Sequence, residues 1–162
     1  MRRVLITGMS GTGKSTVISE LQARGRRAVD LDSDEYSEWV SPDPRAAGTP
    51  VEPGHDWVWR EDRVGALLDR EEGDVLFVSG CAANMGAFVT RFDHVVLLTA
   101  PSDVIAPRLH ERTDGYGTDP AEIARVLDLV QEVEPLLRRI ADTELDTSRG
   151  LDDVVAAVLA VA

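Results

Sequence analysis

Short apolar runs alternate along the chain with longer amphipathic stretches. The runs fall at residues 3–7, 27–31, 75–79, 94–98 and about 143–146. Apolar runs of this length that contain β-branched residues are typical of buried parallel strands. Between them, apolar positions recur at steps of three and four and predict helices over residues 14–24, about 57–72, about 102–112, about 120–141 and about 151–161. Five strands separated by helices predict a parallel sheet in a three-layer α/β domain.

One segment lacks either periodicity. Residues 35–56 hold four prolines, at positions 42, 44, 50 and 53, and we expect a loop there. The chain has 162 residues, which is the size of one domain, and no internal repeat is visible. We therefore expect a single domain over residues 1–162.

The turn after the first strand carries the clearest chemistry. It reads Gly8-Met9-Ser10-Gly11-Thr12-Gly13-Lys14-Ser15-Thr16, which fits the phosphate-loop pattern G-x-x-x-x-G-K-[ST] between a strand and a helix. Glycines let successive N–H groups point at phosphate oxygens, and the helix N-terminus adds positive potential. Lys14 is expected to reach the β- and γ-phosphates, and the Ser15 hydroxyl to ligate Mg²⁺. The expected nucleotide-binding residues of this loop are Gly8, Ser10, Gly11, Thr12, Gly13, Lys14, Ser15 and Thr16.

The amino-acid composition also draws attention to Lys14. Of the 17 basic residues, 16 are arginines and Lys14 is the only lysine. Arg is a broad fork and Lys a compact point charge, so the two are not interchangeable in a tight phosphate loop. Ras-like GTPases resemble one another in a second lysine motif, Asn/Thr-Lys-x-Asp, which this chain cannot contain. Oligomeric AAA-type ATPases carry an apolar strand ending in Asp-Glu, whereas the strand here ends in Ser79-Gly80, so we set that class aside.

Net charge and cysteine content indicate which partners and which compartment to expect. The formal net charge is −12 and the pI is about 4.6, which repels nucleic acid and anionic membranes. The apolar run near the N-terminus is too short for a signal peptide, and the single cysteine, Cys81, fits a reducing cytoplasm. We expect a cytoplasmic monomer or weak homo-oligomer with no nucleic-acid or membrane partner. The three histidines are not at metal-ligand spacing.

The chain resembles the shikimate kinase branch of the nucleoside-monophosphate-kinase-like P-loop kinases. The similarity is carried by four stretches: the loop at 8–15, Asp32-Ser33-Asp34, Trp59-Arg60-Glu61, and residues 134–142, Glu-Pro-Leu-Leu-Arg-Arg-Ile-Ala-Asp. It implies the three-layer P-loop NTPase fold, with a five-stranded parallel sheet in the order 2-3-1-4-5 and helices on both faces. It also implies an acceptor-covering segment at about 33–60 and a lid at about 112–119.

The resemblance implies roles as well. Asp32 would hold the Mg²⁺ shell through water, and Asp34 would hydrogen-bond the acceptor hydroxyl and act on its proton. Arg60 would bind the acceptor and Arg112 would close over the phosphates. Arg108, Thr147 and Ser148 would surround adenine. The expected catalytic residues are thus Lys14, Asp34 and Arg112, and the cofactors ATP and Mg²⁺.

Departures from the family pattern point away from shikimate. The position of the arginine that clamps the shikimate carboxylate is taken by Val133, and the family's glycine triplet is reduced to Gly80-Cys81-Ala82. Loss of a bidentate clamp removes the strongest reason to expect an acidic acceptor. The three tryptophans, at 39, 57 and 59, fall in the acceptor-covering segment and can stack on a sugar or base, or pack as a small core. We expect Trp57, Gly80 and Asn84 to join Asp34 and Arg60 at the acceptor.

Three functions remain open from the sequence. The first is an ATP- and Mg²⁺-dependent kinase that phosphorylates a hydroxyl of a small metabolite. The second is a nucleoside or nucleotide kinase whose tryptophans hold a base. The third is a regulatory NTPase that binds ATP and has no acceptor.

Overall fold

A computed structural model describes residues 1–45, 50–113 and 117–162 of the chain. The expected acceptor-covering segment and lid therefore lie partly outside the described residues, at 46–49 and 114–116 respectively. The strands and α-helices are β1 (Arg2–Thr7), α1 (Lys14–Ala23), β2 (Ala28–Asp30), β3 (Ser37–Val40), β4 (Asp56–Trp59), α2 (Glu61–Asp69), β5 (Val75–Ser79), β6 (His94–Thr99), α3 (Ser102–His110), α4 (Pro120–Ile140), β7 (Thr143–Asp146) and α5 (Leu151–Ala160). Two short 3₁₀ turns, η1 (Met85–Ala87) and η2 (Val89–Arg91), precede β6.

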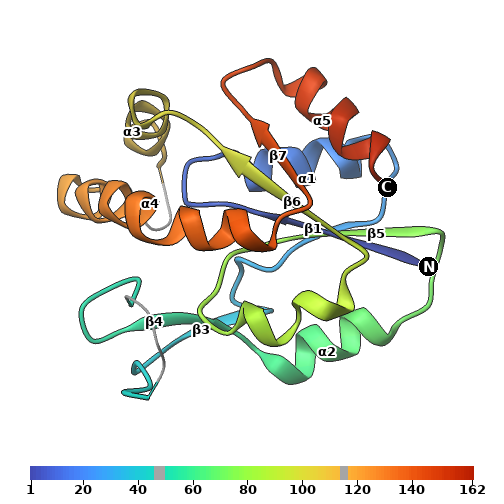
Figure 1. Cartoon of the computed structure of the whole chain (residues 1–162), viewed down its shortest axis with the longest axis horizontal. Helices are drawn as coiled ribbons and strands as arrows, with labels where there is room; N and C mark the ends of the chain where they lie inside the picture. The colour runs from blue at the N-terminus through green and yellow to red at the C-terminus, as the bar shows by residue number, and fades with distance from the viewer. Residues whose placement is uncertain (46–49, 114–116) are drawn as a thin grey trace.

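The central sheet has five parallel strands in the order β2-β5-β1-β6-β7 (Figure 1). Counted along the chain among themselves, these strands stand in the order 2-3-1-4-5, so the predicted topology and three-layer α/β class are confirmed. Because parallel strands all end at one edge, ligands bind in such sheets beyond the carboxyl ends of the strands. The order places β1, and the phosphate loop that follows it, at the centre of the sheet.

Successive side chains of a strand point to opposite faces of the sheet, so the hydrophobic core has one part on each face. On β1, Val4 and Ile6 pack with residues of α1 and α5, whereas Leu5 packs with residues of α2 and α4. Figure 1 shows the same arrangement, with α1 and α5 on one side of the sheet and α2 and α4 on the other. Helix α3 packs mainly against α4, around Ile105 and Leu109.

The expectation of a loop over 35–56 and a helix from about 57 was wrong. Strands β3 and β4 form an antiparallel pair in which Trp39 stands opposite Trp57, and α2 begins only at Glu61. Tryptophan and valine favour a pleated surface, and cross-strand aromatic pairs stabilise two-stranded ribbons. Arg60 has extended backbone angles, which separates the strand from the helix. In Figure 1 this ribbon projects from the molecule on the same side as the loop between β1 and α1.

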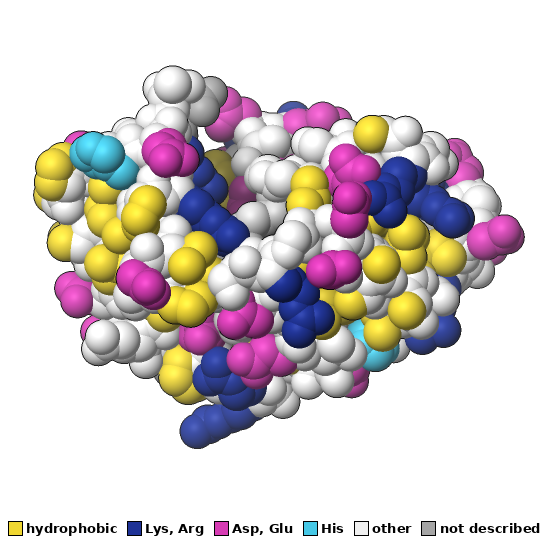
Figure 2. All heavy atoms as spheres, turned by 90° about the horizontal axis from the view of Figure 1, so that it is seen from above, with side chains coloured by type: hydrophobic (Ala, Val, Ile, Leu, Met, Phe, Trp, Pro, Cys, Tyr) yellow, Lys and Arg dark blue, Asp and Glu magenta, His cyan; other side chains and the backbone are white. Residues whose placement is uncertain are grey.

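In the part of the chain that the structure describes, no helix is both long and apolar enough to span a bilayer. The surface carries acidic and basic side chains intermixed, and Figure 2 shows a hollow with basic side chains along its wall.

Candidate active site

The phosphate loop joins the end of β1 to the start of α1. Gly13 has φ +98° and stands directly before the helix, so its left-handed conformation turns the chain into α1 at Lys14. A Cβ added to Gly8 would lie 2.5 Å from the Leu98 carbonyl oxygen, so only glycine fits there. The Thr12 hydroxyl is buried and donates to the Met9 carbonyl at 2.7 Å, which closes the loop on itself. The loop therefore has the fixed curvature that anion binding by main-chain amides requires.

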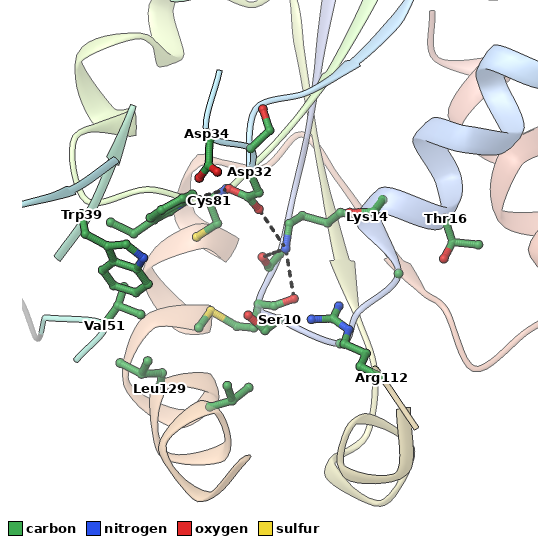
Figure 3. Close-up of a pocket in the computed structure, with 18 residues that line it drawn as sticks. Ser10, Lys14, Thr16, Asp32, Asp34, Trp39, Val51, Cys81, Arg112 and Leu129 are labelled. Carbon is green, nitrogen blue, oxygen red and sulfur yellow. Dashed lines mark hydrogen bonds and ion pairs between the residues drawn. The ribbon is translucent and has the colours of Figure 1, made fainter. Parts of the chain in front are cut away.

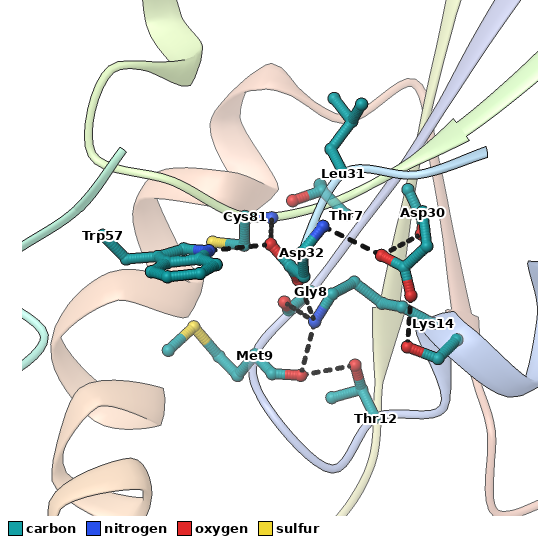
Figure 4. Close-up of polar contacts among 12 residues, drawn as sticks. Thr7, Gly8, Met9, Thr12, Lys14, Asp30, Leu31, Asp32, Trp57 and Cys81 are labelled. Carbon is teal, nitrogen blue, oxygen red and sulfur yellow. Dashed lines mark hydrogen bonds and ion pairs between the residues drawn. The ribbon is translucent and has the colours of Figure 1, made fainter. Parts of the chain in front are cut away.

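Lys14 lies at the centre of the loop. Its ammonium group donates to the carbonyls of Gly8, at 2.8 Å, and Met9, at 3.3 Å, and lies 3.7 Å from Asp32 Oδ2 (Figure 4). The side chain is buried, so its charge acts in a medium of lower polarisability than water. A compact cation held in this way is positioned to stabilise negative charge on a phosphate beside the loop.

Two carboxylates from the end of β2 approach the same loop. Asp30 accepts hydrogen bonds from the Ser15 hydroxyl, from the Ser79 hydroxyl at 3.1 Å and from the Asp32 amide at 3.0 Å. Asp32 accepts from the Trp57 indole at 3.2 Å and from the Cys81 amide at 3.4 Å. Burial raises the pKa of the Asp32 carboxyl, against the attraction of the nearby Lys14 ammonium, which lowers it.

These oxygens suit a hard cation. Mg²⁺ prefers hydroxyl, carboxylate and phosphate oxygens, and Ser15, Asp30 and Asp32 supply oxygens of that kind beside the phosphate loop. No cluster of three or more His, Cys, Asp or Glu side chains that could hold a metal alone occurs within residues 1–45, 50–113 and 117–162. The residues thus fit an ion held jointly by the protein and a nucleotide.

A cavity of about 640 Å³ extends from the phosphate loop to the β3–β4 ribbon (Figure 3). Lys14, Ser10 and Arg112 lie along one part of it, while Trp39, Val51 and Leu129 lie along the other. Trp39 and Trp57 meet at a centroid distance of 5.0 Å, with their planes tilted by 58°. The other residues that line this cavity are Gly8, Met9, Gly11, Gly13, Ser15, Thr16, Asp32, Ser33, Asp34, Trp57, Cys81 and Val126.

A second cavity, of about 370 Å³, is lined in part by Gly11, Gly13 and Thr16, which also line the first. Arg108 lines it and donates to the Gly11 carbonyl at 3.2 Å and to both the hydroxyl and carbonyl of Thr147, at 2.9 and 2.7 Å. The Thr147 hydroxyl in turn donates to the Thr12 carbonyl at 2.7 Å. The structure thus joins the expected adenine residues Arg108 and Thr147 to the phosphate loop.

The structure places other expected site residues differently. Ser148 is exposed and its neighbour Arg149 lines the second cavity instead. Arg60 pairs with Glu38 at 3.0 Å and does not line either cavity. Asp34, by contrast, is exposed at the larger cavity, where Trp57 also lies.

Asn84 and Gly80 support the ribbon. The Asn84 amide accepts from the Trp59 N–H at 2.8 Å and donates to the Trp59 carbonyl at 2.9 Å. A Cβ on Gly80 would lie 3.0 Å from the Trp59 indole nitrogen. Neither residue lines either of the two cavities described above, and both lie against the buried Trp59 of β4.

Sequence reasoning missed much of the apolar lining. It gave no site role to Met9, Val51, Val126 or Leu129, which reach the cavity from the phosphate loop, from the segment before β4 and from α4. Cys81, which the sequence analysis linked only to a reducing compartment, also lines the cavity, where burial raises the pKa of its thiol. Its position directly after β5, at the ligand-binding edge of the sheet, was the one available signal.

The chain matches a family model in sequence and several solved structures in fold. The AAA_18 family model, described as an AAA domain, matches residues 4–128. The shikimate kinase from Acinetobacter baumannii, solved in complex with shikimate, is 22% identical with a TM-score of 0.65, over 99% of this chain and 92% of that one. A gluconokinase from Sinorhizobium meliloti 1021 is 20% identical with a TM-score of 0.58, over 98% and 90%. A sugar kinase from Janibacter sp. HTCC2649 is 18% identical with a TM-score of 0.56, over 99% and 93%.

At these identities, the solved structures establish the shared fold. A search of curated protein sequences gives no match. The AAA_18 match spans more than half of the chain and includes the phosphate loop, which confirms the P-loop family that the resemblance implied.

Proposed function

The chain belongs to the AAA_18 family of AAA domains, and from that premise we propose that it is an ATP- and Mg²⁺-dependent kinase that phosphorylates a hydroxyl of a small metabolite. The observation that carries this proposal is the continuity of the larger cavity. One space of about 640 Å³ is lined both by the phosphate loop and by Asp34, Trp39 and Trp57, which lie beyond it. Hydrolysis by water needs no such chamber, whereas transfer to a second substrate does.

Phosphoryl transfer is promoted mainly by positioning and by neutralising charge on the transferred group. Lys14 and Arg112 supply positive charge along the phosphate part of the cavity. Asp34 is the exposed carboxylate at the cavity and would orient the acceptor hydroxyl and take its proton. Ser15 and Asp32, with Asp30 behind them, would hold Mg²⁺, which when bound neutralises phosphate charge. Arg108 and Thr147 would bound the adenine in the second cavity.

The acceptor is proposed to differ from shikimate. Solved relatives include a shikimate kinase in complex with shikimate and a gluconokinase, so the fold accommodates hydroxylated acids in those proteins. In this chain Arg60 is ion-paired with Glu38. By the resemblance to shikimate kinases, Val133 stands where those enzymes carry the arginine that clamps the shikimate carboxylate. A nucleoside kinase is the second candidate, because Trp39 is 43% exposed and forms a ring pair with Trp57 where a base could stack.

A coupled assay of ADP release tests the proposal. ATP and Mg²⁺ are supplied with panels of sugars, polyols, nucleosides and nucleotides, and the phosphorylated product is identified by mass spectrometry. At least one compound should stimulate ADP release, and Asp34→Asn should abolish that stimulation while ATP binding is retained. Asp153→Asn is the matched control, since Asp153 is exposed on α5 and lines neither cavity. ATP hydrolysis that no compound stimulates would favour the regulatory NTPase.

A further inference from the structure

The acceptor end of the larger cavity is apolar and acidic. Figure 3 shows Trp39, Val51 and Leu129 together on the side away from Arg112, with Asp34 and Asp32 above Lys14. Met9, Cys81 and Val126 add further apolar surface to the lining. An acceptor that enters this space therefore meets ring faces, aliphatic groups and carboxylates.

The basic groups of the lining are on the phosphate side. In the described part of the chain, Lys14 and Arg112 are the basic residues that line this cavity. Lys14 is held by the carbonyls of Gly8 and Met9 and by Asp32, where the transferred phosphate would be. Residues 46–49 and 114–116, which the structure does not describe, contain no Lys, Arg or His in the sequence.

The arginines around the acceptor segment already have partners. Arg60 pairs with Glu38 at 3.0 Å, and Arg45 pairs with Asp43 at 3.2 Å. Arg63 donates to the Glu35 carbonyl at 2.7 Å. Arg125, on α4, donates to the carbonyls of Pro50 and Val51 at 2.6 and 3.2 Å.

The negative charge of an anionic acceptor would be poorly balanced at this end of the cavity. A carboxylate among these side chains would lose hydration without gaining a guanidinium partner, and it would face two like charges. The net charge of −12 would also repel an anion during approach.

The Trp39–Trp57 pair favours a molecule with a flat apolar face or an ammonium group. Trp39 and Trp57 stand opposite each other in the β3–β4 register, and the Trp57 indole is fixed by its hydrogen bond to Asp32. Trp39 leaves 43% of its surface exposed. Such rings bind flat apolar faces by stacking and ammonium groups by cation–π attraction.

From these contacts we propose that the acceptor is a hydroxyl compound without a carboxylate or phosphate, uncharged or amine-bearing, that lays a flat or apolar face against Trp39 and Trp57. This inference rests on the proposed function and names the acceptor class of that site. The site selects against hydroxy acids such as the shikimate bound in one of the similar solved structures.

Two matched sets of probes test the inference with ADP and Mg²⁺ present. One set is 4-(hydroxymethyl)benzylamine, 4-(hydroxymethyl)benzamide and 4-(hydroxymethyl)benzoate, and the other is methyl shikimate and shikimate. Binding is followed by the indole N–H resonances of the three tryptophans, and turnover by ADP release with ATP. The amine, the amide and the methyl ester should bind at least ~100-fold more tightly than their carboxylate counterparts, since unpaired like charges cost several orders of magnitude in specificity.

Trp39→Ala should weaken binding of the amine and amide ~10-fold, in the range lost when one stacked ring is removed, and should leave ADP binding unchanged. Equal or tighter binding of benzoate or shikimate would overturn the inference, and so would failure of every probe to shift an indole resonance. Probes that bind in the expected order without stimulating ADP release would leave the acceptor class standing and contradict the kinase proposal.

Discussion

Asp30 offers the sharpest test of how the phosphate loop holds its metal. The strand that in related P-loop proteins can supply an acidic metal partner ends here in Ser79, and Ser79 is paired with Asp30 on the neighbouring strand. The Asp30 carboxylate accepts a hydrogen bond from the Ser15 hydroxyl through Oδ2, and its Oδ1 accepts hydrogen bonds from the Ser79 hydroxyl and the Asp32 amide. With its proton held by Asp30, the Ser15 oxygen can direct a lone pair at Mg²⁺.

Asp30→Asn tests the negative charge of the Asp30 side chain, and Asp30→Ala tests its contribution to stability. Asp30→Asn keeps an acceptor at Oδ1 for two of the three bonds and loses the charge that faces Ser15. A hydrogen bond to a charged group contributes ~1.5–3 kcal/mol and a neutral one ~0.5–1.5 kcal/mol, so a loss of ~1–1.5 kcal/mol is expected at Ser15. That difference corresponds to a ~5–12-fold rise in the Mg²⁺ concentration that half-saturates the nucleotide complex.

Asp30→Ala should also destabilise the protein. Ser79 is fully buried, and a buried hydroxyl without its acceptor costs ~1–3 kcal/mol. For a domain of this size that is a fall in Tm of ~2–12 °C.

Titration of Mn²⁺ into protein and ADP, followed by electron paramagnetic resonance, measures the metal midpoint without any need for turnover. Thermal unfolding of the same variants measures stability, with Asp153→Asn as the control that should change neither. A midpoint for Asp30→Asn within twofold of the wild type would show that Asp30 does not orient Ser15 for the metal.

Three further outcomes follow from single contacts. Arg108→Lys should weaken nucleotide binding ~10-fold or more by calorimetry, because one ammonium cannot reproduce the guanidinium's bonds to Thr147; unchanged affinity would contradict this. Asn84→Ala should lower Tm by ~2–12 °C through the unpaired Trp59 backbone, with KM for any acceptor unchanged. A raised KM with an unaltered Tm would instead assign Asn84 to the acceptor. The Cys81 thiol has a pKa raised by burial, so its alkylation by iodoacetamide should be slow at pH 8 and still rising at pH 9–10, where an ordinary thiol of pKa ~8.5 levels off. A rate that levels off near pH 8.5 would show that the thiol is not desolvated.

The sheet and the phosphate loop could be predicted because their signals are local. The glycines, Lys14 and the flanking apolar run lie within one short stretch, and strand alternation needs no knowledge of partners. The strand order was implied by the resemblance to shikimate-kinase-like P-loop kinases.

The β3–β4 ribbon could not be read in the same way, because it depends on pairing between segments separated by prolines. Trp57 and Trp59 were assigned to the start of a helix, and only the opposing Trp39 and Ser37 make them a strand. The partners of Arg60 and Asn84 were hidden for a related reason. A resemblance places a residue in the sequence, but Glu38 and the Trp59 backbone decide what that residue contacts.

Isothermal calorimetry of Mg²⁺–ATP binding tests whether the loop at residues 8–15 holds the nucleotide phosphates. We expect one saturable site in the wild-type protein and affinity weakened by orders of magnitude in Lys14→Ala. Arg139 is an exposed cation on α4, and Arg139→Ala should bind as the wild type does. Absence of binding for every purine triphosphate with magnesium present, or full affinity in Lys14→Ala, would contradict it.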